Sequence, residues 1–274
     1  MVKHFEGLGD KWRALVADPD VTVKAKIVPT IAKDGGTREA WQSHTPEGHT
    51  VLMAYPATEP CRSALILRGD EAKKDYKPVS ALPLLEGIEN VVEIDETYAW
   101  ANEAEGEISI QHPGGSPLWL FNPLFYRDRW SCQAGQKQIM RVAGLAYAMR
   151  RATQESIQVK GGPQFDAYAA AYKEKNPSIA DADIPPLTLP LKGAHIVQPY
   201  QNACDYQIRV PVQDVKTCKY NDEEMYMIAI SLGGKDGNAL RCMLYASKQV
   251  LGDYVPKAGD DIEAIIWLQA RFTD

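Results

Sequence analysis

The sequence predicts a mostly β protein of the α+β class. We expect an N-terminal α+β module followed by two tandem small antiparallel β-barrel modules. The barrel modules are compatible with an OB-like fold and are joined by a helix and a proline-rich connector. Short apolar runs rich in β-branched residues recur between tight turns, which is typical of antiparallel strands. The clearest run is the last one, Lys257–Phe272 (KAGDDIEAIIWLQARF), where an Ala-Gly-Asp turn leads into a strand suited to burial. A similar succession of strands and turns occurs earlier in the chain.

Residues 1–80 are expected to form an antiparallel sheet with one helix. Phe5–Val16 carries apolar side chains at helical spacing, which predicts a short amphipathic helix. Val21–Ile31 alternates apolar and polar residues, which predicts a half-buried strand. His49–Tyr55 and Arg62–Leu67 are further candidate strands, whereas Lys77–Gly87 contains two prolines and is interpreted as a connector.

Residues 86–153 and 204–274 are the two expected barrel modules. Their candidate strands are Val91–Asp95, Glu107–Ile110, Leu118–Phe121 and Ile139–Met149 in the first, and Val212–Val215, Met227–Ile230, Leu240–Leu244 and Ile262–Phe272 in the second. One constant offset places Val92 on Val212, Trp100 on Tyr220, Ile108 on Ile228 and Ile110 on Ile230; after two short insertions, Leu118 falls on Leu240 and Ala134-Gly135 on Ala258-Gly259. Few residues are identical, so chance similarity is an alternative to duplication. A true repeat would make Ile139–Met149, which also suits a helix, a strand.

Residues 154–203 lie between these modules and contain the clearest helix, Gln164–Lys175. Its alanines favour helix, Pro163 suits the first turn and Asn176-Pro177 ends it. One face of this helix is formed by Phe165, Tyr168, Ala169 and Tyr172. Ile184–Leu191, with three prolines, should be an extended connector lying against a barrel.

Length, charge and cysteine content narrow the class of protein. The 274 residues, 45% of them hydrophobic, are enough for several modules. The net charge of −6 disfavours a surface devoted to nucleic-acid backbones. No apolar run reaches the roughly 18 residues needed to span a bilayer, and the N-terminus lacks the apolar centre of a signal peptide, so we expect a cytoplasmic protein without membrane contact. The five scattered cysteines suggest buried thiols, and no cofactor is expected.

Aromatic and basic residues coincide in one stretch, Phe121–Trp130 (FNPLFYRDRW). Rings that stack on unpaired bases, next to arginines that meet phosphates, are the combination used by single-strand binders. The candidate residues are Phe125, Tyr126, Arg127, Arg129 and Trp130, with Arg141, Arg150 and Arg151 extending the groove. The alternative is that the rings fill the core while the arginines pair with Asp128 or other acids.

Two groups of residues raise the question of a metal. His44 and His49 flank a loop that contains Glu47, and two imidazoles with a carboxylate can ligate a metal ion. Asp260, Asp261 and Glu263 form an acidic cluster before the last strand, where carboxylates could hold a cation. Neither spacing matches a standard site, and acidic residues are common wherever a chain turns.

The sequence contains no GxSxG elbow, Walker A motif or GxGxxG motif, and no catalytic residue is predicted. We therefore expect a non-enzymatic binding or scaffold protein that acts through a protein partner or through self-association. The alternatives are a single-stranded nucleic-acid binder that uses residues 121–130 and a metal-dependent hydrolase that uses the histidines or the acidic cluster.

Overall fold

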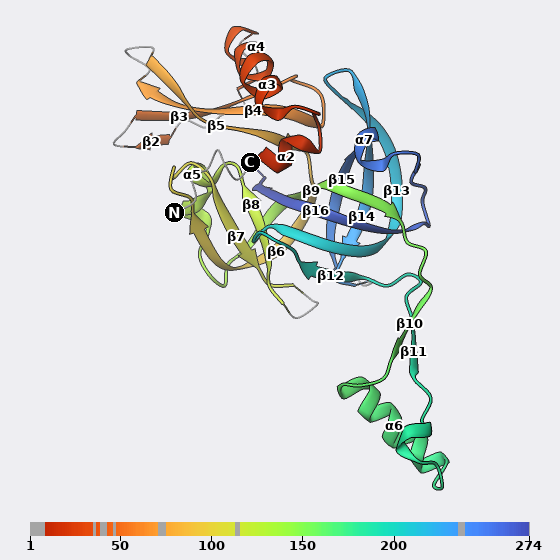
Figure 1. Ribbon diagram of the computed structural model, residues 1–274. Helices are drawn as coiled ribbons and strands as arrows, with labels where there is room; N and C mark the ends of the chain where they lie inside the picture. The colour runs from red at the N-terminus through yellow and green to blue at the C-terminus, as the bar shows by residue number, and fades with distance from the viewer. Residues whose placement is uncertain are drawn as a thin grey trace. The chain divides into compact units, whose positions relative to one another are not determined.

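The computed structural model describes residues 9–34, 37–38, 43–45, 48–70, 75–112, 116–234 and 239–273. The chain divides into two compact units, Met1–Arg151 with His195–Asp274, and Ala152–Ala194 (Figure 1). The protein is mostly β, as the sequence predicts. Of the helices in the described ranges, none combines the length and apolar character needed to cross a membrane. The start of the predicted helix at 5–16 lies outside these ranges.

The N-terminal part of the large unit consists of short helices and a five-stranded sheet, called here the N-terminal sheet. The helical segments are α2 (Gly9–Arg13), α3 (Pro19–Thr22), the π-helical η1 (Val23–Ile27) and α4 (Val28–Asp34). The strands are β1 (Thr37–Arg38), β2 (Ser43–Thr45), β3 (Gly48–Tyr55), β4 (Cys61–Asp70) and β5 (Asp75–Leu85). The strands predicted at His49–Tyr55 and Arg62–Leu67 are confirmed as β3 and β4.

The strand predicted at Val21–Ile31 is wrong, because this segment is helical from α3 through α4. Its buried residues are Val23, Ile27 and Ile31, spaced four apart as on one side of a helix, whereas Val21 is exposed. The apolar residues fit the repeat of a strand as well as that of a helix. The helix forms because its apolar face packs against the N-terminal sheet.

The connector predicted at Lys77–Gly87 is also wrong, because most of it is strand β5. β5 pairs with β4 and lies at the end of the strand order of its sheet. A proline has no N–H to donate to a neighbouring strand, and an edge strand needs none on its outer side. This position explains how Pro78 and Pro83 are accommodated.

The larger sheet has nine strands in the order β12-β13-β14-β15-β9-β16-β8-β7-β6. Their bounds are β6 (Ile88–Ala99), β7 (Gly106–Ile110), β8 (Leu118–Asn122), β9 (Lys137–Arg151), β12 (Ile196–Pro199), β13 (Asp205–Tyr220), β14 (Glu223–Leu232), β15 (Leu240–Ser247) and β16 (Asp261–Phe272). Short helical turns, α5 (Phe125–Asp128), η2 (Arg129–Ser131) and α7 (Lys248–Leu251), interrupt the connections. Ile139–Met149 is therefore strand, as predicted from the comparison of the two halves.

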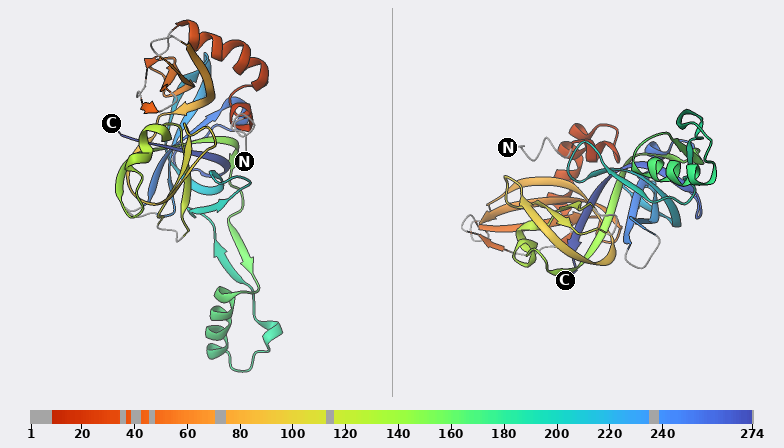
Figure 2. Two further views of the ribbon diagram at one scale, coloured as in Figure 1. Left: turned by 90° about the vertical axis from the view of Figure 1, so that its left-hand side faces the viewer. Right: turned by 90° about the horizontal axis from the view of Figure 1, so that it is seen from below.

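Two further pairings, β13–β16 and β9–β6, close this sheet into two rings. One ring runs β13-β14-β15-β9-β16 and the other β6-β7-β8-β16-β9, so both rings contain β9 and β16. Each ring has one parallel pair, β15 with β9 and β8 with β16. In Figure 1 and the left view of Figure 2, the red and orange N-terminal elements lie together on one side of the nine-stranded sheet.

The four strands β6–β9 and the four strands β13–β16 pair in the same order and directions. The N–H of Gly135 bonds to the carbonyl of Ile94, and the N–H of Gly259 bonds in the same way to Val212. Both glycines have positive φ, which favours glycine in each turn. A register shift follows Ile94 in β6 and Val212 in β13, so the two β-bulges also correspond.

These pairings correct some of the residue correspondences predicted from sequence. Ile110 and Ile230 are counterparts as expected, since each faces the residue that precedes the bulge. Val212, however, corresponds to Ile94 rather than to Val92. Leu118 faces Ile110 while Cys242 faces Ile230, so Leu118 corresponds to Cys242 rather than to Leu240.

Specific polar contacts tie the N-terminal part to the rings. Gln269 of β16, 2% exposed, accepts a hydrogen bond from the backbone N–H of Leu85 at 2.9 Å and donates one to the carbonyl of Pro83 at 3.0 Å. In α2, the indole of Trp12 donates to the carbonyl of Ala81. The bonds of Gln269 fix β5 against β16, which both rings share, and the bond of Trp12 fixes α2 against β5.

The small unit, residues 152–194, consists of a two-stranded ribbon and one long helix. Its elements are β10 (Ser156–Val159), α6 (Pro163–Lys175), the 3₁₀ turn η3 (Asp181–Asp183) and β11 (Leu187–Pro190), which pairs antiparallel with β10. The predicted helix is thus confirmed, and part of the predicted extended segment is strand β11.

Candidate functional sites

The aromatic and basic stretch 121–130 is largely packed into the protein. Phe125 and Tyr126 lie in the short helix α5 and are buried. The Arg127 guanidinium contacts the Asp128 carboxylate at 2.5 Å. Two of the three rings and one arginine are therefore engaged within the fold.

Arg129 and Trp130 remain at the surface end of this stretch. Trp130 is 71% exposed, and the Arg129 guanidinium lies 4.7 Å from its ring centroid, within the range of a cation–π contact. Arg141, Arg150 and Arg151 each pair with a nearby glutamate or aspartate. One exposed ring with one arginine is a small surface for a nucleic acid, and binding through residues 121–130 stays a prediction.

His44 and His49 face each other across the β2–β3 pair as directly opposed residues. The side chain of His44 and the intervening Glu47 lie outside the described residues. No group of three or more His, Cys, Asp or Glu side chains within the described ranges is arranged to hold a metal ion. A metal at His44 and His49 therefore stays a prediction.

The acidic cluster Asp260, Asp261 and Glu263 lies at the start of β16, and two of its carboxylates pair with arginines. Asp260 contacts Arg151 at 2.9 Å and also accepts a hydrogen bond from the Tyr254 hydroxyl. Glu263 contacts Arg150 at 2.7 Å and Arg209 at 2.9 Å. Asp260 thus connects the turn before β16 to the end of β9, and Glu263 connects β16 to β9 and β13.

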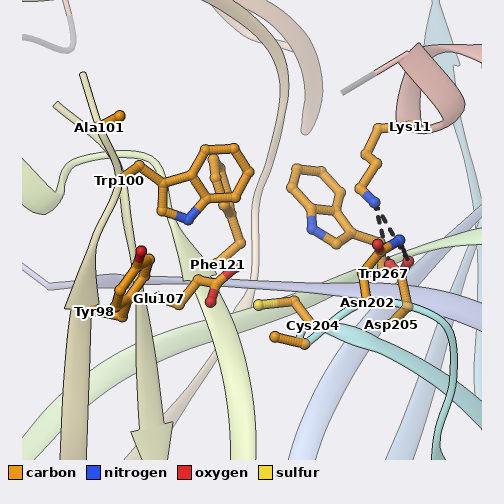
Figure 3. A pocket seen from close by; sticks show the side chains of 11 residues that line it. Lys11, Tyr98, Trp100, Ala101, Glu107, Phe121, Asn202, Cys204, Asp205 and Trp267 are labelled. Atoms are coloured by element: carbon orange, nitrogen blue, oxygen red, sulfur yellow. Dashed lines mark hydrogen bonds and ion pairs between the residues drawn. The ribbon is translucent and has the colours of Figure 1, made fainter. Parts of the chain in front are cut away.

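A cavity of about 280 Å³ lies where α2, the start of β13 and the β6–β8 strands meet. Its walls are mainly aromatic: Trp100 and Phe121 meet edge to face with centroids 5.5 Å apart, and Phe121 and Trp267 lie 5.0 Å apart. In Figure 3, Trp100 and Trp267 stand on either side of Phe121, with Glu107 and Cys204 below them. Tyr98, 60% exposed, is at the rim.

A buried ion pair closes one side of this cavity. The ammonium of Lys11 lies 3.3 Å from the nearer oxygen of Asp205, and the two residues are 4% and 2% exposed. Asp205 also accepts hydrogen bonds from the Tyr147 hydroxyl at 2.9 Å and the Asn202 amide at 2.5 Å. Both oxygens of Asp205 are thus occupied, and the charge of Lys11 is balanced.

Glu107 and Cys204 are the remaining titratable groups below the aromatic rings. Burial raises the pKa of Glu107, although a hydrogen bond from Trp100 and the charge of Lys11 oppose the shift. Burial raises the pKa of the Cys204 thiol well above its usual value, so this thiol is neutral and a poor nucleophile. The cavity is suited to binding rather than to covalent chemistry.

Helix α6 in the small unit presents a second candidate surface. Among residues 152–194, all of which the structure describes, only Leu191 is buried. Along α6 the rings of Phe165, Tyr168 and Tyr172 follow one another with centroids 6.1 and 5.7 Å apart. This aromatic face is half-buried at most, and no side chain of the helix is buried.

Comparison with models of known protein families, with curated proteins and with solved structures found no match. The function therefore has to follow from the two surfaces themselves: the aromatic face of α6 and the cavity between Lys11 and Trp100.

Proposed function

We propose that this protein is a non-enzymatic binding or scaffold protein, and that its partner is a second copy of the same chain held through α6. The observation that carries the proposal is the aromatic face of α6, formed by Phe165, Tyr168, Ala169 and Tyr172, in a unit that buries almost none of its own side chains. A helix gains most of its stability by packing an apolar face, which α6 does not do within its unit.

The charges on α6 favour a second copy in antiparallel orientation. Asp166 is in the first turn and Lys173 in the last, seven residues further on, so both lie on the same flank of the aromatic face. A two-fold axis across the middle of the face would place Asp166 of each copy opposite Lys173 of the other. Lys173 contacts Asp181 within its own unit, but that pair is exposed and contributes little, so it can be exchanged.

The rings of strands supply a rigid frame in this proposal. The two OB-like barrels expected from sequence stay part of it: each would be built on one ring, one from β6–β9 and one from β13–β16, with both using the shared long strands. An isologous contact through one helix face is small, so we expect a weak, concentration-dependent dimer.

Sedimentation velocity and light scattering of the full chain, from about 1 µM to roughly 1 mM, test the proposal. We expect the mass to rise from monomer to dimer across this range. Tyr168→Glu combined with Tyr172→Glu should abolish the dimer, whereas Ala167→Glu combined with Ala170→Glu, which adds the same charge on the opposite, exposed face of α6, should leave it unchanged.

A charge exchange identifies the orientation. Asp166→Lys and Lys173→Asp should each weaken the dimer, and the double exchange should restore it, because both cross-pairs are then reformed with opposite sign. A monomer mass throughout the concentration range, or a dimer that survives the Tyr168 and Tyr172 substitutions, would overturn the proposal.

A further inference from the structure

We propose that the cavity between Trp100, Phe121, Trp267 and Glu107 binds a small alkylated ammonium compound, a free molecule whose quaternary or tertiary nitrogen lies against the aromatic rings and next to Glu107. This site lies in the large unit and is independent of the proposed contact through α6. It would give the protein a small-molecule ligand in addition to its protein partner.

The shape and lining of the cavity fit such a cation. The rings of Trp100, Phe121 and Trp267, from the turn after β6, β8 and β16, line a space of about 280 Å³, and the ammonium of Lys11 lies 5.8 Å from the Trp267 centroid on one side of it. The faces of aromatic rings attract cations, and rings grouped around one space are the arrangement that recognises quaternary ammonium groups. Tyr98 at the rim supplies a further ring from strand β6 (Figure 3).

The charges select a cation over an anion. Lys11 and Asp205 balance each other at 3.3 Å, so Glu107 carries the remaining charge among the described residues that line the cavity. An anion would meet two carboxylates and an ammonium that is already bonded. A cation would instead meet Glu107 and Trp100, on the side of the cavity away from the Lys11 ammonium (Figure 3), without having to break the pair of Lys11 with Asp205.

Hydrogen bonding selects an alkylated over a primary ammonium. A primary ammonium has three N–H groups to satisfy on burial. Asp205 already accepts bonds from Lys11, Tyr147 and Asn202, and Glu107, the other acidic acceptor of the cavity, accepts one from Trp100. An alkylated ammonium needs few acceptors or none, and its methyl groups pack against the rings.

Choline is the probe for this proposal, titrated into the full chain by calorimetry and by tryptophan fluorescence. The comparison compounds are 3,3-dimethylbutan-1-ol, which has the same shape without the charge, and ethanolamine, which has the charge without the methyl groups. We expect choline to bind at least about tenfold more tightly than either, since only choline combines the positive charge with methyl groups that pack against the rings.

Variants separate the contributions of charge and rings. Glu107→Gln and Trp100→Leu should each weaken choline binding about tenfold, whereas Trp100→Phe, which keeps a ring but loses the hydrogen bond to Glu107, should weaken it less than Trp100→Leu does. Glu93→Gln, which removes an exposed carboxylate from the neighbouring strand β6, is the matched control and should bind as the unaltered chain does. Thermal unfolding of each variant verifies that it is folded.

Several results would overturn the assignment. The neutral alcohol binding as tightly as choline would make the site an apolar pocket, and tighter binding of ethanolamine would make it a hydrogen-bonding amine site. Absence of choline binding up to roughly 10 mM would leave no ammonium site at all. Co-sedimentation with phosphatidylcholine vesicles, without binding of free choline, would assign the cavity to a lipid headgroup instead.

Discussion

At the scale of single residues, the contact between Lys11 and Asp205 brings together the N-terminal helix and the first residue of β13. Both side chains are almost completely removed from solvent, and charges in that position are tolerated only when they are paired and hydrogen-bonded. Asp205 has three such partners, Lys11, Tyr147 and Asn202. The pair thus fixes where α2 lies and also forms one wall of the cavity.

Lys11→Met should lower the free energy of unfolding by about 3 kcal/mol. This value is at the lower end of the range for breaking a buried ion pair, because Asp205 keeps the hydrogen bonds from Tyr147 and Asn202. Urea unfolding measures this loss. The double variant Lys11→Met with Asp205→Asn removes both charges and should recover most of it. A single variant as stable as the unaltered chain would contradict the importance of the pair.

Glu107 should make stability depend on pH. Burial raises the pKa of Glu107 in the folded state, so the folded protein binds the Glu107 proton more tightly than the unfolded chain does. The stability that this proton contributes is complete below the unfolded-state pKa and is lost as the pH rises through the folded-state pKa. The groups that act on Glu107 are Trp100, Lys11 and Asp205, with Cys204 and Tyr206 also nearby. Each comes from an element that surrounds the cavity.

Glu107→Gln should therefore be more stable than the unaltered chain at pH 7, and this gain should vanish below about pH 4, where the carboxyl is protonated in both states. Urea unfolding at both pH values measures the difference. Glu93→Gln, on the exposed face of β6, should show no such trend. A gain that is the same at both pH values would point to packing rather than to charge.

The sequence identifies only part of the cavity. Its residues come from six separate stretches, around Lys11, Trp100, Glu107, Phe121, Asp205 and Trp267, and nothing in their spacing indicates that they meet. The stretch that does combine rings and arginines, 121–130, turns Phe125 and Tyr126 inward. An aromatic residue in a loop has the same sequence signal whether it faces the core or a ligand.

At the scale of elements, the long strands β9 and β16 carry most of the architecture. Each pairs with three other strands, and Gln269 of β16 also satisfies the backbone of β5. The side chain of Gln269 thus substitutes for a strand neighbour at the edge of the N-terminal sheet. Its partner groups, on Leu85 and Pro83, have to be satisfied because this region is buried.

Gln269→Leu should cost about 1–3 kcal/mol, the penalty for leaving a buried backbone N–H without an acceptor. Guanidinium unfolding measures the loss, and hydrogen exchange at the Leu85 amide should accelerate. Gln207→Leu, at an exposed position of β13, serves as the matched control and should have little effect. Equal losses in the two variants would contradict the role of the side-chain bonds.

The incorrect strand at 21–31 and the incorrect match of Val92 to Val212 have a common physical cause. Alternating or four-spaced apolar residues at 21–31 fit strand and helix alike, and only the surface that covers them distinguishes the two. In the repeat, matching Val92 rather than Ile94 to Val212 is an error of two residues. Such a slip leaves every side chain on the same face of its strand, so the apolar pattern contains no signal against it.

At the scale of the whole molecule, burial is distributed very unevenly between the two units. The large unit contains two apolar clusters that fill the rings and the space below the N-terminal sheet. The small unit, with one buried side chain, has little to hold α6 in place. Segments with few buried apolar contacts open with a low free energy, so the units should differ in dynamics.

Hydrogen exchange measured at low protein concentration should show rapid exchange of the α6 amides and slow exchange in β9 and β16. Raising the concentration should protect α6 if the helix pairs with a second copy, and the Tyr168 and Tyr172 substitutions should remove that protection. Protection of α6 that is strong at every concentration would show that the small unit is stabilised within one chain.

The sharing of β9 and β16 between the rings makes each group of four strands depend on the other. A single group of four strands, β6–β9 or β13–β16, lacks the fifth strand of its ring and takes it from the other group. As two separate molecules, the two groups would complete their rings only by exchanging long strands, which is domain swapping. The present fold therefore has the topology of a swapped dimer fused into one polypeptide. In sequence, the segment that contains α6 joins the two groups of four strands.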